Sequence, residues 1–162
     1  MDVKEYRVGI ADLDIASSPD KIITVGLGSC IGIALYDKQN LVGGLLHIML
    51  PDSTLFSSVT NPLKFADLGI PILIEKMERK GAVKRNLIAK IAGGASMFNF
   101  SDKNLIMDIG NRNTTAVKKK LKELSIPLLG EDVGGNKGRT MVLETISGSV
   151  QIKTVGLGIK EL

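Results

Sequence analysis

The chain contains one cysteine, Cys30, and one histidine, His47, and these two side chains can form a nucleophile and a general base. A free thiol has a pKa of about 8.5 and is mostly protonated at neutral pH, but a neighbouring imidazole can accept its proton. The same imidazole can then deliver a proton to a leaving group. The pair therefore predicts a small cysteine hydrolase in which Cys30 attacks and His47 transfers the proton.

The segment before the cysteine has the composition of a substrate-binding bend. A β-branched run, typical of a buried strand, is followed by the glycine-rich residues 26–29 and then by Cys30. Glycines let the backbone approach a substrate closely, and the N–H groups around Gly28 and Ser29 are placed to hold a tetrahedral oxyanion. Thr24, on the preceding strand, is expected to orient the histidine ring through its hydroxyl or its carbonyl.

A hairpin is predicted to bring the two reactive side chains together. Apolar runs over residues 31–36 and 41–50 flank the polar tetrapeptide 37–40, which indicates strand, turn, strand. With a two-residue loop, Cys30 lies directly opposite His47, so both project from the same face of the sheet. The tetrapeptide lacks the glycine that two-residue loops favour, so a longer loop is the alternative, and a one-residue slip would separate the two faces.

Each of the two residues also has a purely structural interpretation. A single cysteine in an apolar strand is commonly a small buried hydrophobe, and a histidine within an apolar run is commonly a hydrogen-bonded core residue. Cys30 and His47 suggest catalysis only when taken together, with the glycine bend at one and the hairpin joining it to the other.

The hydrophobic pattern predicts a single α/β domain over residues 1–162. Asn61 and Pro62 indicate the start of a helix that ends near Gly81 and that Pro71 could kink, and residues 108–124 form a second, amphipathic helix. The last strands are expected to be antiparallel. Strands and two helices without regular alternation predict a layered α/β sandwich with a mixed or largely antiparallel sheet. The predicted strands are 5–15, 22–25, 31–36, 41–50, 87–91, 127–133, 140–146 and 150–155.

Composition narrows the possible functions. The 162 residues carry a net charge of +4 with 4% aromatic residues and no Trp, which disfavours a stacking surface for single-stranded nucleic acid. No apolar run approaches the ~20 residues of a membrane span, and the N-terminus lacks a signal-peptide pattern, so a cytoplasmic protein is expected. The glycine pairs lack nucleotide-binding spacing, and a single His and Cys do not make a typical zinc site. Residues 52–61 are expected to form a surface loop that could cover a site.

Two motifs are similar to those of the CheD family of chemoreceptor glutamine deamidases. They are the heptapeptide 24–30, Thr-Val-Gly-Leu-Gly-Ser-Cys, and residues 43–51, Gly-Gly-Leu-Leu-His-Ile-Met-Leu-Pro. The resemblance extends over essentially the whole chain, and places the family's cysteine, histidine and threonine on Cys30, His47 and Thr24. It also implies an α/β sandwich akin to the catalytic domain of cytotoxic necrotizing factor toxins. Further matching segments are residues 90–95, 110–113, 130–135 and 138–139.

The resemblance implies a reaction and partners. The family hydrolyses glutamine side-chain amides on methyl-accepting chemotaxis receptors to glutamate, with no metal or organic cofactor, no nucleic acid and no insertion into the membrane. It also implies binding to CheC, the phosphatase that acts on phosphorylated CheY and restrains its deamidase.

Two further hypotheses stay open beside deamidation. The chain could be a non-catalytic docking regulator of receptors or of CheC, or a cysteine hydrolase of an unrelated substrate. Replacing Cys30 by Ala separates the first of these from catalysis, because docking should survive and hydrolysis should not.

Overall fold

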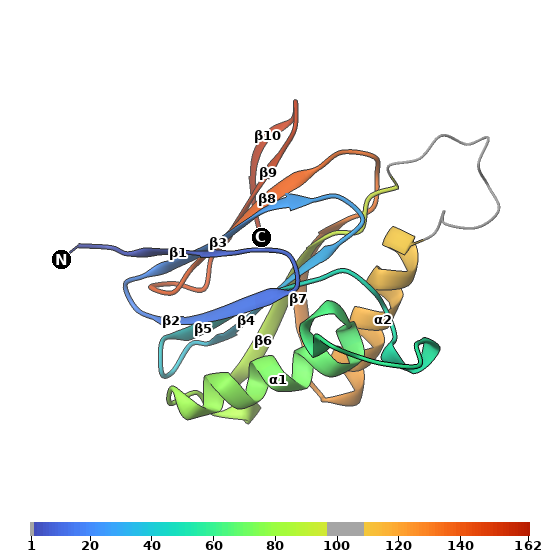
Figure 1. Cartoon of the computed structure of the whole chain (residues 1–162). Coiled ribbons are helices and arrows are strands. Elements are labelled where there is room, and N and C mark those ends of the chain that lie inside the picture. The colour runs from blue at the N-terminus through green and yellow to red at the C-terminus, as the bar shows by residue number, and fades with distance from the viewer. Residues whose placement is uncertain (1, 97–108) are drawn as a thin grey trace.

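Two five-stranded sheets pack face to face, and two helices cover the outer face of one of them (Figure 1). The computed structural model describes residues 2–96 and 109–162. Sheet A has the order β1-β3-β8-β9-β10 and sheet B the order β2-β5-β4-β6-β7. Both sheets are mixed, since β1 pairs with β3 and β6 with β7 in parallel while the other pairs are antiparallel. The chain is therefore a mixed α/β protein, as the sequence predicts.

The chain crosses between the two sheets at β1, β2, β3 and β4, then keeps β4 to β7 in sheet B and β8 to β10 in sheet A. Sheet A contains β1 (Glu5–Val8), β3 (Lys21–Leu27), β8 (Arg139–Glu144), β9 (Val150–Thr154) and β10 (Gly158–Glu161). Sheet B contains β2 (Asp12–Ser17), β4 (Ile31–Asp37), β5 (Val42–Ile48), β6 (Leu87–Gly93) and β7 (Leu128–Val133). The helices are α1 (Ala66–Arg79) and α2 (Ile109–Glu123), with short 3-10 turns η1 (Ser53–Leu55), η2 (Pro62–Lys64) and η3 (Lys84–Asn86).

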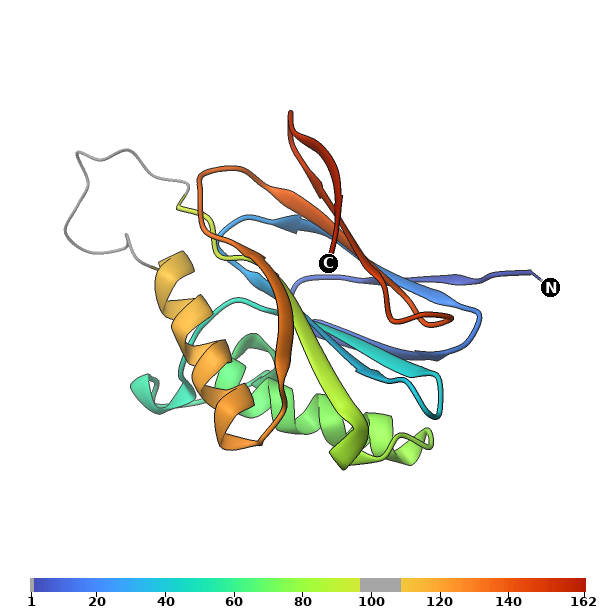
Figure 2. The same ribbon diagram turned by 180° about the vertical axis from the view of Figure 1, so that it is seen from behind.

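Strands β4 and β5 lie between two cores, so every residue of both is buried. One face packs against the helices in a helix-side core that includes Ile33, Leu46, Leu73 and Val117. The other face packs against sheet A in an inter-sheet core that includes Leu27, Leu45, Met141 and Leu143. A strand buried on both faces has a continuous apolar sequence, which accounts for the unbroken runs on either side of the hairpin loop. Figure 2 shows the three layers, which are sheet A, sheet B and the helices, from behind.

The predicted register of the β4–β5 hairpin is wrong by two residues. Asp37 pairs with Val42, which leaves a four-residue loop, and His47 lies opposite Gly32. The physical reason is the Asp37 carboxylate, which accepts hydrogen bonds from the N–H groups of Gln39 at 2.9 Å and Asn40 at 3.1 Å and so organises the longer loop. Because the shift is even, Cys30 and His47 remain on the same side of the register as diagonal neighbours.

Several element boundaries also differ from the prediction. A turn at Gly9–Ala11 divides the expected first strand into β1 and β2, which belong to different sheets. Asn61 caps the 3-10 turn η2, through a 3.0 Å bond to Leu63 N, and α1 begins only at Ala66 and continues through Pro71. β7 is parallel to β6 instead of antiparallel, because α2 carries the chain back across the sheet.

The remaining comparisons with the prediction concern the last strand, the second helix, the surface loop and membrane-spanning helices. Strand β10 was not predicted, because it is short and exposed at all four residues. Of the predicted second helix, Asp108 lies outside the described residues. Residues 54–60 are exposed around η1, as expected for a surface loop. Within residues 2–96 and 109–162, no helix has the length and apolar character needed to cross a bilayer.

Candidate active site

Thr24 and His47 meet between the two sheets. Thr24 lies on β3 of sheet A and His47 on β5 of sheet B, and both are fully buried. Thr24 Oγ1 is 2.8 Å from His47 Nδ1, so the hydroxyl and not the carbonyl of Thr24 contacts the ring. The contact exists because the inward faces of the two sheets oppose each other at this point.

The hydrogen bonds around Thr24 determine which imidazole nitrogen carries the proton. The Thr24 hydroxyl donates its only hydrogen to the carbonyl of Val8 at 2.8 Å. It must therefore accept a hydrogen bond from His47 Nδ1–H, which makes Nε2 the unprotonated nitrogen of the neutral ring. His47 Nε2 is buried and has no hydrogen-bond partner among the described residues. This arrangement presents a lone pair that can accept a proton.

Burial keeps both reactive groups neutral in the resting protein. Burial lowers the pKa of His47 to about 4, well below its usual value of 6.5. Burial also raises the pKa of the Cys30 thiol, an effect partly opposed by the backbone N–H of Cys30 itself. The chemistry that this pair can perform is proton transfer from thiol to imidazole as a substrate carbon is attacked, rather than storage of a thiolate–imidazolium pair.

Cys30 lies in the connection from β3 to β4 and is partly exposed, whereas the histidine is fully buried. The carbonyl of Cys30 accepts a 2.8 Å bond from Gly94 N, and the carbonyl of Gly28 accepts a 2.8 Å bond from Ala95 N. Gly93 has a φ of +116°, and a Cβ on it would collide with the Cys30 carbonyl oxygen. The end of β6 therefore fixes the bend, and only glycine allows so close an approach.

The N–H groups of the bend differ in their availability. Gly28 N already donates to Gly26 O at 3.1 Å, so it is not free to bind an oxyanion in this conformation. Neither Ser29 N nor Cys30 N donates to a backbone carbonyl within the described part of the chain. Of the two loop residues that the sequence suggests, Ser29 thus has the more suitable N–H, together with that of Cys30.

Two residues that sequence reasoning did not select support this bend. Asn113 on α2 donates to Ser29 O and Met49 O. Arg139 on β8 is 7% exposed and donates to Gly93 O at 3.0 Å and Gly134 O at 2.7 Å. Both occur in segments that the sequence resemblance includes, which was the only signal for them.

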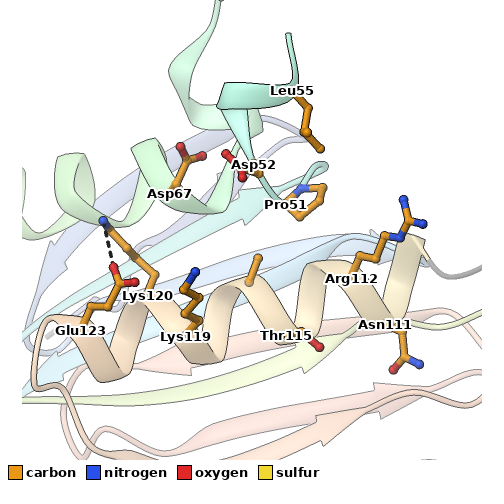
Figure 3. Close-up of a pocket in the computed structure, with 11 residues that line it drawn as sticks. Pro51, Asp52, Leu55, Asp67, Asn111, Arg112, Thr115, Lys119, Lys120 and Glu123 are labelled. Atoms are coloured by element: carbon orange, nitrogen blue, oxygen red, sulfur yellow. Dashed lines mark hydrogen bonds and ion pairs between the residues drawn. The ribbon is translucent and has the colours of Figure 1, made fainter.

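A separate pocket lies beside the site without including it. Its volume is about 670 Å³, and it opens between α2 and the segment around η1 (Figure 3). None of Cys30, His47 and Thr24 lines it. Among residues 2–96 and 109–162, no cluster of three or more His, Cys, Asp or Glu side chains could hold a metal ion. The pocket is lined by Pro51, Asp52, Leu55, Asp67, Asn111, Arg112, Thr115, Ala116, Lys119, Lys120 and Glu123.

The fold and the site together define a two-sheet α/β protein in which the only histidine contacts Thr24 between the sheets and the only cysteine packs against the inter-sheet core. The family described as "CheD chemotactic sensory transduction" matches residues 49–154. Proteins named "Probable chemoreceptor glutamine deamidase CheD" from Clostridium botulinum (strain Hall) and Clostridium tetani (strain Massachusetts) are each 74% identical to this chain over 162 residues. These alignments cover 100% of this chain, and 100% and 98% of the respective relatives. The chain belongs to the CheD family.

Proposed function

We propose that this protein is a chemoreceptor glutamine deamidase that converts receptor glutamines to glutamates, with Cys30 as nucleophile and His47 as general base. The substrate class follows from the full-length relatives, 74% identical, that are named for this activity. The observation that carries the chemistry is the Thr24–His47 bond, since it leaves His47 Nε2 as an unprotonated and unpartnered base among the described residues. Thr24 is then a positioning residue that fixes the tautomer of the base.

The first half of the reaction forms a thioester. Cys30 Sγ attacks the carboxamide carbon of glutamine while its proton moves to His47 Nε2. The carbonyl becomes a tetrahedral oxyanion held by the N–H groups of Ser29 and Cys30. The carbon–nitrogen bond then breaks, and the proton on Nε2 passes to the leaving nitrogen, which departs as ammonia.

The second half regenerates the thiol. Water loses a proton to His47 Nε2 and attacks the thioester carbon, and the carbon–sulfur bond breaks. The proton returns to Cys30, and the product is a glutamate side chain. The sum is glutamine plus water giving glutamate plus ammonia, without a redox step.

The same proposal includes features that go beyond the family assignment. The protein acts in the cytoplasm on the cytoplasmic portion of receptors, it binds a CheC phosphatase that restrains it, and it neither binds nucleic acid nor inserts into the membrane. We further propose that its fold is akin to the catalytic domain of cytotoxic necrotizing factor toxins and that residues 1–162 act as one domain.

The test is mass spectrometry of a purified receptor cytoplasmic fragment incubated with the wild-type protein, Cys30→Ala or His47→Ala. We expect a gain of about one dalton per modified glutamine with the wild type only, because Cys30→Ala lacks the nucleophile and His47→Ala lacks the general base. If no sample changes while all three proteins still bind the fragment, the protein is a docking regulator and the deamidase proposal is wrong. Modification by Cys30→Ala would exclude Cys30 as the nucleophile.

A further inference from the structure

Asn113 links the two segments that carry the candidate nucleophile and base. Its side-chain amide nitrogen donates to Ser29 O at 3.0 Å and to Met49 O at 2.9 Å. Ser29 immediately precedes Cys30, and Met49 follows His47 by two residues. Asn113 itself is fully buried on α2, so the bonds are shielded from water.

The two carbonyls lie just beyond the end of the β4–β5 ladder. The last pair of this ladder is Ile31 with Ile48, and the chain after it turns away, because Met49 N donates to Lys64 O at 2.8 Å. Backbone pairing between β4 and β5 therefore stops immediately before Cys30 on one strand and immediately before Met49 on the other. The amide of Asn113 joins the two strand ends where the ladder does not.

The hydrogen-bond chemistry of Asn113 points to a specific need for its donors. Both contacts are carbonyl oxygens, which only accept hydrogen bonds, so the NH₂ group of the amide and not its oxygen must face them. Its Oδ1 is buried and has no partner among the described residues. A buried acceptor without a partner costs free energy, so the amide is retained for its two donor bonds rather than for general polarity.

We infer that Asn113 is a positioning residue that sets the alignment of Cys30 with His47. The inference rests on the proposed roles of those two residues and adds the element that holds them in register from outside the sheets. Loss of the donors should let the Ser29–Cys30 bend move relative to the end of β5. Proton transfer from thiol to imidazole depends steeply on this alignment.

The test uses Cys30 as the only thiol of the chain, so its alkylation by iodoacetamide can be followed without interference from other cysteines. The variants are Asn113→Leu, which keeps the approximate volume and removes the donors without adding charge, and Asn113→Ala. Val117→Ala is the matched control, because Val117 lies one turn further along α2 and is fully buried in the helix-side core. His47→Ala supplies the reference for a thiol without its base.

We expect the pH dependence of alkylation in both Asn113 variants to approach that of His47→Ala, while Val117→Ala keeps the wild-type profile with a lowered Tm. With receptor fragment as substrate, kcat should fall about 10- to 100-fold with KM changed by less than about threefold. If Asn113→Leu alkylates like Val117→Ala, the inference is overturned even where deamidation by the wild type is observed. If the wild type does not deamidate but the alkylation profiles separate as stated, the inference stands and the proposed function fails.

Discussion

Gly32 lies directly opposite His47 in the β4–β5 ladder, on the face that meets sheet A. A Cβ on Gly32 would come within 2.7 Å of Met141 Sδ and 3.2 Å of a Leu27 methyl group, which places it in the inter-sheet core. Gly32 therefore places no side chain opposite the imidazole on this face of the ladder.

Replacement of Gly32 by Ala should reduce activity more than stability. The flexible end of Met141 can move aside, so we expect a loss of about 1 kcal/mol in the free energy of unfolding. The new methyl group is attached at the residue directly opposite His47, so we expect it to disturb the imidazole and to lower kcat about tenfold. Gly43→Ala on the same face of β5 is the control, since its Cβ would crowd Leu143 at 2.8 Å in the same core. Equal kcat losses in both variants would argue against a special role of Gly32.

Thr24→Val removes the hydroxyl while keeping the shape of the side chain. His47 Nδ1–H and the Val8 carbonyl both lose their partner, so we expect the protein to lose about 1–3 kcal/mol of stability. The histidine tautomer is no longer fixed, and kcat should fall about 10²-fold. Thr24→Ser retains the hydroxyl and should recover most of the activity, as measured by receptor deamidation and by urea unfolding. Full activity of Thr24→Val would contradict the positioning role.

The acid limb of the activity profile should lie well below that of an ordinary histidine. His47 acts as a base only when neutral, and burial lowers its pKa to about 4. We therefore expect kcat/KM to stay level as the pH falls through 6.5 and to decline only on approach to about 4. Initial rates between pH 4 and 8, on protein checked to be folded by circular dichroism, measure this directly. A midpoint near 6.5 would show that the working imidazole is solvated.

His47 should also make stability depend on pH in one particular window. Because its pKa is lower in the folded than in the unfolded chain, its contribution is fully present above pH 6.5 and is lost as the pH falls to about 4. The whole contribution is at most about 3 kcal/mol. Since His47 is the only histidine, its contribution can be isolated by urea unfolding of the wild type and His47→Gln at pH 7 and pH 5. The measured quantity is the change in the free energy of unfolding between the two pH values. Parallel pH dependence in the two proteins would exclude a buried neutral imidazole.

Asp37 is expected to control the hairpin register on which the site depends. It is fully buried, and although burial favours its neutral form, hydrogen bonds from Asn40, Val83 and Asn86 hold its pKa below the usual value. Asp37→Ala should cost about 2–4 kcal/mol of unfolding free energy, because several partly buried hydrogen bonds lose their shared acceptor. Urea unfolding measures the loss, with the exposed Lys38→Ala as control. Equal stability of the two variants would show that the loop is held by other contacts.

The sequence was sufficient to predict the class of fold and a contact between Thr24 and His47, but not the register of the hairpin. The apolar runs on either side of residues 37–40 indicated two paired strands, and the structure contains them as β4 and β5. The length of the loop depends on hydrogen bonds to the Asp37 side chain, and residue propensities do not predict these bonds. Because the register error is an even number of residues, the pairing pattern still assigns positions 30 and 47 to the same side of the sheet.

The parallel pairing of β6 and β7 does have a signal in the sequence, whereas two other features do not. The strand 87–91, the helix 108–124 and the strand 127–133 form a strand–helix–strand unit, which is typical of parallel pairing. The division of residues 5–15 between two sheets had no such signal, since both parts are short. No local pattern indicates the role of Asn113, because its bonds to Ser29 and Met49 join segments 84 and 64 residues away.

The contact between Thr24 and His47 joins the two sheets, and this has a consequence for fragments of the protein. β3 pairs with β8 from the last quarter of the chain, and β5 packs against α1, so each partner is held in place by distant parts of the sequence. A proteolytic piece that ends before β8 would retain Cys30, His47 and Thr24 yet lack the strand that supports β3. Such a piece should neither fix the imidazole nor protect it from water, so limited proteolysis between α2 and β8 should inactivate the protein while leaving all three residues on one fragment.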